Sequence, residues 1–252
     1  MGRKGERGHL KRKPAPKLWP IHRKEAVWTV VSKSGPHSRS GSLPLALIVR
    51  DMLGLAKTGK ESKNIISQGK IMVDGKVRRD EHFLVGLMDV VSIVDAKKSY
   101  RVLPSKKGLI LLPIESDEAV FKLYRIEDKT IVKGGKLQLD LHDGTCFLIG
   151  VDNSQVSQED AYQTLDVLQL SVLERELLGH MKLTVGANAI VIGGKNMGKV
   201  GKVTTIERKP NQKRRDTIVT IEDKNGSQFQ TILNFVFILG EKASSISVPE
   251  AA

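Results

Sequence analysis

The stretch of sequence that most suggests chemistry is a glycine-rich loop, GGKNMGKV, at residues 193–200. Its spacing nearly matches the nucleotide-binding loop G-x-x-x-x-G-K-[ST], in which backbone N–H groups cradle phosphates and a hydroxyl contacts Mg²⁺. Val200 stands where that hydroxyl is required, and the β-branched run GKVTTIE follows where a helix should begin. We therefore predict a strand, a glycine turn and a second strand here, without a nucleotide site.

Paired acidic residues are the second group that could do chemistry, because two carboxylates can bind a metal or divide acid and base roles. Asp117 and Glu118 form one pair, and Asp140 and Asp143 form another. Neither pair is accompanied by a His, Cys or Ser constellation, so we expect solvated turns. The single cysteine, Cys146, allows neither an intrachain disulfide nor a Cys-rich zinc site, as is usual inside cells. We predict no catalytic residue, no metal, no cofactor and no small-molecule substrate.

Net charge is the strongest global signal. The 252 residues include 41 Lys and Arg against 28 Asp and Glu, for a formal net charge of +13. Clustered cations displace counterions from phosphates, so nucleic acid is the first expected partner and an anionic membrane surface the second. Apolar runs such as LPLALIV are far shorter than the roughly 20 residues that span a bilayer, and no signal peptide is recognisable. The few aromatics, 2 Trp, 3 Tyr and 6 Phe, favour recognition of phosphates and RNA shape over base stacking.

The charge divides the chain into segments of different character. Residues 1–41 carry 11 basic and 2 acidic residues, and residues 42–108 carry 13 and 7. Residues 109–182 reverse the balance, with 7 basic and 13 acidic residues, and residues 183–252 return to 10 and 6. We expect a multidomain, α+β and β-rich protein with five parts: an extended basic arm (1–41), a basic module (42–108), an acidic β-rich domain (109–182), a small barrel (183–243) and a tail (244–252).

The first segment has the composition of an arm that becomes ordered only against an anion. Its cations would repel one another on a free chain, and its prolines favour extended backbone. Trp19 and Trp28 are interleaved with them and could pack on bases or on the following domain. The alternative is a disordered tail or a localisation signal. The cations that we expect to contact nucleic acid are Arg3, Lys4, Arg7, Lys11, Arg12, Lys13, Lys17 and Arg39.

Residues 42–108 predict a compact module of two helices and a small sheet. SLPLALIVRDML indicates a helix with Ser42 as N-cap, and TGKESKNIISQGK a second helix that Thr58 and Glu61 cap reciprocally. Asp74-Gly75 predicts a two-residue hairpin turn, and DVVSIVD a closing strand. The basic residues expected to share one RNA-contacting face are Lys57, Lys60, Lys63, Lys70, Lys76, Arg78 and Arg79. Charge reversal at Lys60, Lys63, Lys70 and Arg78 should weaken RNA binding, whereas reversal at Lys122 and Lys129 should not.

The sequence "IISQGKIMVDGKVRRD", with two short helices and the closing "DVVSIV", resembles the alpha-L RNA-binding domain. Farther along, residues 183–243 are similar to a KOW motif in an SH3-like barrel, because the glycine turn is flanked by strand patterns such as TIVTIED and NFVFILG. The acidic segment between them alternates short apolar runs with turn signals, which predicts an antiparallel sheet. The barrel's expected RNA-binding cations are Lys195, Lys199, Lys202, Lys213, Arg214 and Arg215.

In this order, the parts resemble the archaeal and eukaryotic (e-type) family of small-subunit ribosomal protein four. That resemblance implies a cytoplasmic, ribosome-associated structural protein that is not an enzyme and whose partners are small-subunit ribosomal RNA and neighbouring ribosomal proteins. Independently, the residues favour multivalent contacts with phosphates and 2′-OH groups that hold RNA helices together. Two alternatives remain: an RNA-modifying enzyme with an RNA-binding appendage, and a KOW-containing transcription or translation factor.

Overall fold

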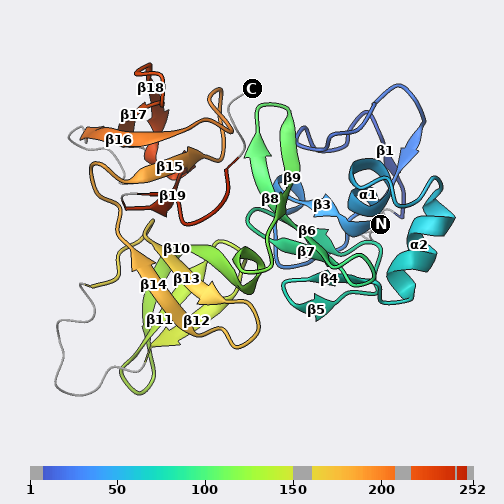
Figure 1. Cartoon of the computed structure of the whole chain (residues 1–252), viewed down its shortest axis with the longest axis horizontal. Helices are drawn as coiled ribbons and strands as arrows, with labels where there is room; N and C mark the ends of the chain where they lie inside the picture. Colours follow the sequence, from blue (N-terminus) through green and yellow to red (C-terminus); the bar gives the residue numbers. More distant parts are fainter. Residues whose placement is uncertain (1–7, 150–160, 208–216, 242, 249–252) are drawn as a thin grey trace, which may run out of the picture. The chain divides into compact units, whose positions relative to one another are not determined.

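The computed structural model describes residues 8–149, 161–207, 217–241 and 243–248. The chain divides into two compact units, which are described separately: Met1–Val102 with Lys107–Leu111, and Leu103–Lys106 with Leu112–Ala252. Most regular structure is strand, and one helix of nine residues stands out, so the prediction of a multidomain, α+β and β-rich protein is confirmed (Figure 1). Among the described residues, no helix has the length and apolarity to cross a membrane.

The N-terminal segment of the first unit is anchored on protein. Strands β1 (Leu10–Lys11) and β2 (Trp28–Thr29) pair antiparallel. Between them, Trp19 is only 2% exposed, and its indole N–H donates to the carbonyl of Ser42 at 2.7 Å. The structure therefore corrects the expectation that this segment becomes ordered only against an anion. Over residues 8–41, a buried tryptophan supplies an apolar contact that the composition did not predict.

The first helical region differs from its prediction. Leu43–Pro44 forms strand β3, which pairs with β6 (Leu84–Val85), and helix α1 (Leu45–Leu47) continues into a π-helical turn, η2 (Ile48–Met52). Ser42 is not the N-cap, because its hydroxyl donates to the carbonyl of Ser38 at 2.6 Å. Pro44 takes the capping position, with the extended φ and ψ that its ring and its pairing with β6 favour.

The second helix and the hairpin follow their predictions. Helix α2 (Gly59–Ser67) begins with the capping box of Thr58 and Glu61. Strands β4 (Ile71–Val73) and β5 (Lys76–Val77) join through a turn whose two residues both have positive φ, as a two-residue hairpin requires. They enter a sheet of order β5-β4-β7-β8-β9, completed by the strands β7 (Val90–Ile93), β8 (Lys98–Ser105) and β9 (Gly108–Ile114).

The acidic segment forms the predicted antiparallel sheet, of order β12-β11-β10-β13-β14, but its first apolar run, LILLPI, lies in β9 of the preceding sheet. Its long central strand, β10 (Phe121–Val132), follows a short 3-10 turn, η3 (Glu118–Val120). Leucines of β11 and β13 pack with Tyr124 and Ile126 of β10 into one core. The remaining strands are β11 (Lys136–Leu141), β12 (Cys146–Ile149), β13 (Val167–Ser171) and β14 (Leu177–Met181). The last of these was not predicted, since ELLGHM lacks clear alternation.

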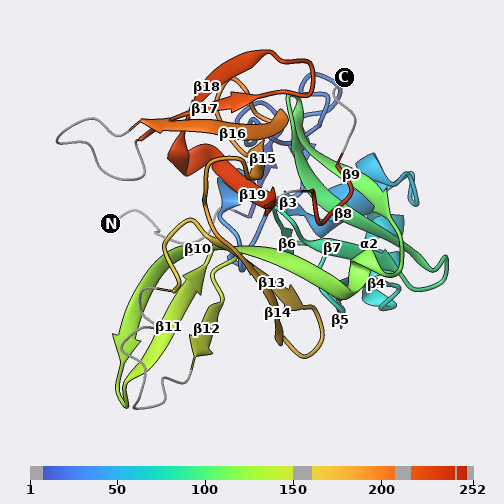
Figure 2. The same ribbon diagram turned by 60° about the vertical axis from the view of Figure 1, so that its left-hand side comes forward.

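The C-terminal barrel has the strand order β18-β17-β16-β15-β19, and Figure 2 shows these strands in orange to red. The predicted order of strand, glycine turn and strand is confirmed by β15 and β16, and the Asn225-Gly226 turn by β17 and β18. Alternate apolar residues of these strands face one core, which also takes Leu165. The bounds are β15 (Asn188–Val191), β16 (Val200–Glu207), β17 (Ile218–Glu222), β18 (Gln228–Ile232), the 3-10 turn η5 (Leu233–Phe235) and β19 (Val236–Gly240).

Candidate nucleic-acid interface

Helix α2 presents two lysines on its outer face. Ser62 and Ile66, four residues apart, are buried against the unit, whereas Lys60 and Lys63 are exposed on the other side. Just before the helix, the backbone N–H groups of Lys57 and Thr58 donate to the Glu61 carboxylate, which lowers the pKa of Glu61. The Glu61 carboxylate at this end of α2 would repel a phosphate, so the lysine side chains are the groups expected to attract one.

The hairpin of β4 and β5 follows α2 in the chain (Figure 1), and it carries further cations. Lys76 is exposed at the start of β5. Gly69 ends the helix with φ +78, and a Cβ at this glycine would lie 3.5 Å from Nε of Arg79 and 3.1 Å from Val77. The exposed Arg79 guanidinium thus lies over the C-terminal end of α2, so helix and hairpin contribute positive charge to adjoining surfaces.

Three of the seven cations predicted for this face already have protein partners. Lys63 pairs with Glu81 at 3.1 Å, and Lys70 pairs with Asp95 at 2.9 Å. Arg78 is half-buried, with its guanidinium 4.3 Å from the centre of the Phe83 ring. The other four are exposed and form no ion pair with any described residue: Lys57, Lys60, Lys76 and Arg79.

In the N-terminal segment, one predicted contact residue is buried. Arg12 is only 9% exposed, and its guanidinium donates to the carbonyls of His22 and Trp28 and to the carboxylate of Glu25. These contacts hold the segment together, a role that differs from the RNA contact predicted for Arg12 from the sequence. Its neighbours Lys11, Lys13 and Lys17 are exposed, as is Arg39, which also donates to the carbonyl of Ser32. Arg3, Lys4 and Arg7 lie outside the described residues.

The glycine loop between β15 and β16 contacts protein where a phosphate loop would contact a nucleotide. A Cβ on Gly198, whose φ is +85, would lie 2.7 Å from the Cα of Ser105, and one on Gly193 would lie 2.8 Å from the Phe235 ring. The N–H groups of Val191 and Gly198 donate to the carbonyls of Lys199 and Val191. Val200 then opens strand β16 where a phosphate loop would open a helix, so the glycines here serve close packing.

The cations of the barrel are exposed on and beside this loop. Lys195 and Lys199 lie in it, with the Lys199 Nζ 4.7 Å from the centre of the Phe229 ring. Lys202 on β16 stands opposite Glu222 of β17, which partly offsets its charge. Lys106, which was not among the predicted contact residues, is an exposed cation beside this loop, with its backbone N 3.1 Å from where a Gly198 Cβ would be. Its place beside a hairpin glycine could have identified it. Lys213, Arg214 and Arg215 lie outside the described residues.

The acidic domain holds a buried ion pair that the sequence did not indicate. Lys122 Nζ lies 3.6 Å from Asp143 Oδ2, and the side chains are 1% and 6% exposed. Burial disfavours the Asp143 carboxylate, but the Lys122 charge and two hydrogen bonds from Thr145 outweigh it and lower the pKa of Asp143. Asp143 is thus no solvated turn residue, and Lys122 cannot serve as a neutral control for charge reversal.

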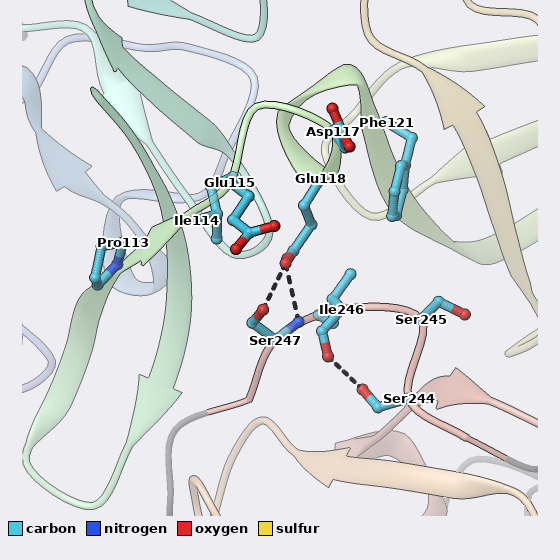
Figure 3. Close-up of a pocket in the computed structure, with 10 residues that line it drawn as sticks. All are labelled: Pro113, Ile114, Glu115, Asp117, Glu118, Phe121, Ser244, Ser245, Ile246 and Ser247. Carbon is cyan, nitrogen blue, oxygen red and sulfur yellow. Dashed lines mark hydrogen bonds between the residues drawn. The ribbon is translucent and has the colours of Figure 1, made fainter. Parts of the chain in front are cut away.

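Near the other acidic pair, the C-terminal segment lines an open cavity of about 720 Å³ (Figure 3). Ser247 donates from its backbone N–H and its hydroxyl to one oxygen of the Glu118 carboxylate, at 3.1 and 2.7 Å. Ile246 is buried beside it. Glu115 and Asp117 also line the cavity, so its charge would repel phosphate. Within the described residues, no three His, Cys, Asp or Glu side chains come together to hold a metal ion.

Comparison with known proteins finds four family matches along the chain. The RS4NT (NUC023) domain matches residues 4–40 and the S4 domain residues 44–91. The ribosomal family S4e matches residues 96–177 and the KOW motif residues 185–222. A protein named small ribosomal subunit protein eS4, from Desulfurococcus amylolyticus, is 49% identical over 253 residues, with 100% of each chain covered. The chain belongs to the S4e family of ribosomal proteins.

Other S4e relatives cover the chain equally well. Proteins of the same name from Staphylothermus marinus and Methanocaldococcus jannaschii are 48% and 43% identical, and they match 100% and 98% of this chain. A crystal structure of the 30S ribosomal protein S4e from Thermoplasma acidophilum superimposes with a TM-score of 0.66 at 31% identity, covering 82% of this chain and 99% of that one. The resemblance drawn from the sequence motifs is confirmed.

Proposed function

We propose that the protein is a structural constituent of the small ribosomal subunit that binds ribosomal RNA and holds neighbouring RNA helices in place. The observation that carries this proposal is that four cations of the S4 domain, on α2 and the hairpin beside it, are exposed without ion-pair partners among the described residues. A protein core gains nothing from such a cluster, whereas a phosphate backbone would neutralise it. The family and its full-length relatives support this assignment.

The mechanism is electrostatic and multivalent. Each lysine or arginine releases counterions when it meets a phosphate, and each contact alone is weak. Cations on the S4 domain, the N-terminal segment and the barrel would contact separate places on folded RNA, so that binding at one raises the effective concentration of the others. Phosphate and 2′-OH contacts suit double-stranded RNA, whose deep major groove hides its base edges.

The domain division predicted from charge, with parts at 1–41, 42–108, 109–182 and 183–243, gives each part a role in this proposal. The three basic parts bind RNA. The acidic domain would be repelled by phosphate, so we assign it to spacing or to contact with neighbouring ribosomal proteins, in a cytoplasmic particle. Its buried Lys122–Asp143 pair and the Glu118–Ser247 contact are structural, and we assign the protein no catalytic activity.

The two alternatives make different demands. An RNA-modifying enzyme needs a catalytic group, and the strongest candidate, Asp143, is committed to Lys122 and Thr145. A KOW-containing transcription factor would copurify with RNA polymerase.

Sedimentation of cell extract through a sucrose gradient tests the proposal. We expect the protein to migrate with the small subunit, to resist moderate salt washes and to dissociate at high salt, because phosphate contacts weaken steeply with ionic strength. If the protein stays at the top of a low-salt gradient, or migrates with polymerase, the proposal fails.

A further inference from the structure

The two tryptophans of the N-terminal segment have opposite environments. Trp19 is buried at 2% exposure and hydrogen-bonded, so it anchors the segment. Trp28 is 56% exposed on strand β2. An exposed tryptophan is a large apolar surface left in water, and this residue type is enriched where proteins bind partners.

The backbone that carries Trp28 is fixed in advance. Lys11 of β1 stands opposite Trp28 of β2, and the N–H of Arg12 donates to the carbonyl of Val27 at 2.9 Å. The buried Arg12 guanidinium also donates to the carbonyl of Trp28 at 3.3 Å. A ring held on such a support loses little conformational entropy when a ligand covers it.

The surroundings of the ring are cationic. Lys11 Nζ lies over one face of the Trp28 ring, 5.9 Å from the ring centre, and the His9 ring lies 5.6 Å away at an interplanar angle of 54°. A base would therefore stack on the part of the indole that Lys11 does not cover. Residues 8–41 contain eight Lys and Arg against a single acid, Glu25, whose carboxylate accepts from Arg12. An aromatic face beside a lysine is the combination with which proteins bind single-stranded nucleotides, by base stacking and phosphate contact.

We propose that Trp28 and Lys11 form a binding site for one unpaired RNA nucleotide, whose base stacks on the indole while its phosphate pairs with the lysine ammonium. This site rests on the proposed function and refines it. Most contacts read phosphates and shape, as the low aromatic count indicates, and one contact captures a base that has left its helix. The surrounding charge favours RNA over a neighbouring protein as the occupant.

Tryptophan fluorescence tests the proposal, because the chain has only these two tryptophans. The purified protein is titrated with a small-subunit ribosomal RNA transcript. We expect wild-type emission to be quenched on binding, and the Trp28→Phe variant, which reports Trp19 alone, to show little quenching. Trp28→Phe should bind nearly as tightly as wild type, whereas Trp28→Ala should bind about 5- to 150-fold more weakly.

The salt dependence separates stacking from charge. Trp28→Ala should leave the slope of log affinity against log salt unchanged, while Lys11→Ala should reduce it by roughly 0.7 to 0.9. Unchanged Trp19 emission in the Trp28→Phe variant shows that the segment remains folded. If all variants bind RNA like wild type, without quenching at Trp28, the nucleotide site is wrong and the proposed function stands. The site is also wrong if Trp28→Ala binds the RNA transcript with wild-type affinity and is defective only in assembly with ribosomal proteins. If wild type does not bind the transcript, both proposals fall.

Discussion

Lys122 Nζ and Asp143 Oδ2 lie 3.6 Å apart inside the acidic domain, and this pair joins strand β10 to the turn after β11. Removing one partner of a buried ion pair leaves the other charge without compensation. We expect Lys122→Ala to lower the free energy of unfolding by about 3–5 kcal/mol, measured by urea denaturation. The exposed Lys133→Ala should change it by less than about 0.5 kcal/mol. Equal effects of the two substitutions would show that the pair contributes nothing.

The same pair predicts a pH dependence of stability. The pKa of Asp143 is lowered in the folded protein, because the Lys122 charge and the Thr145 hydrogen bonds outweigh the cost of burial. A lowered folded pKa stabilises the protein above the unfolded value, and this stabilisation is lost as the pH falls through the folded pKa. In urea titrations, we expect the free energy of unfolding of wild type to exceed that of Asp143→Asn by a constant amount near neutral pH. Below about pH 4 this difference should shrink. A margin that widens on acidification would contradict the assignment.

RNA affinity is expected to depend on the exposed cations of the S4 domain. The double variant Lys60→Glu, Arg79→Glu removes one charge from α2 and one from the hairpin. It should weaken binding to ribosomal RNA and reduce the slope of log affinity against log salt by roughly 0.7 to 0.9 for each phosphate that is no longer neutralised. The matched control is Lys133→Glu, Lys136→Glu, two exposed lysines of the acidic domain, which should bind like wild type. An equal decrease in affinity in both double variants would show that binding depends on net charge alone and not on the position of the cations.

Arg12 and Lys13 are adjacent cations with different predicted roles. Arg12 is buried among carbonyls and a carboxylate, so Arg12→Ala should loosen the N-terminal segment and leave buried acceptors unsatisfied. Lys13 is exposed, and Lys13→Ala should weaken RNA binding without changing stability. Limited proteolysis of the free protein distinguishes them: faster cleavage within residues 8–41 is expected for Arg12→Ala only. The Arg12 account is wrong if that variant is as resistant as wild type.

The glycine loop of the barrel offers a test of packing against nucleotide binding. Gly198→Ala places a Cβ within 2.7 Å of the Ser105 backbone at φ +85, whereas Gly134→Ala has φ +88 and open space. The Gly134 variant measures the cost of the left-handed conformation alone, about 1–2 kcal/mol. Gly198→Ala should be distinctly more destabilising in thermal unfolding. Loss of measurable ATP or GTP binding in Gly198→Ala, with stability unchanged, would instead revive a nucleotide site.

Features with short-range physical causes were predictable from sequence. The Thr58–Glu61 capping box, the Asp74-Gly75 turn and the glycine turn before Val200 each depend on a few neighbouring residues, and all three are present. The failures involve partners distant in sequence. The hydroxyl of Ser42 was expected to cap a helix, but it bonds to Ser38, because pairing with β6 keeps Leu43 and Pro44 extended.

The candidate site shows the same division. The sequence indicated which residues carry positive charge, but it could not show which of them the fold would use internally. Arg12 meets Glu25, Lys70 meets Asp95, and Lys122 meets Asp143 through contacts that span 13 to 25 residues of chain. Exposure and ion pairing are properties of the folded chain. The net charge of the sequence therefore cannot distinguish cations that stabilise the fold from those available to RNA.

Hydroxyl-radical probing of ribosomal RNA from single cysteines tests the central claim most directly. The native Cys146 is exposed on the acidic domain, and Asn64→Cys in a Cys146→Ser background places a probe one turn from Lys60 on α2. The Asp140 hydrogen bond raises the pKa of the Cys146 thiol, so labelling is done at alkaline pH. With an iron chelate attached, we expect position 64 to cleave small-subunit RNA strongly and position 146 weakly. Strong cleavage from position 146 with none from position 64 would contradict RNA binding through the S4 domain.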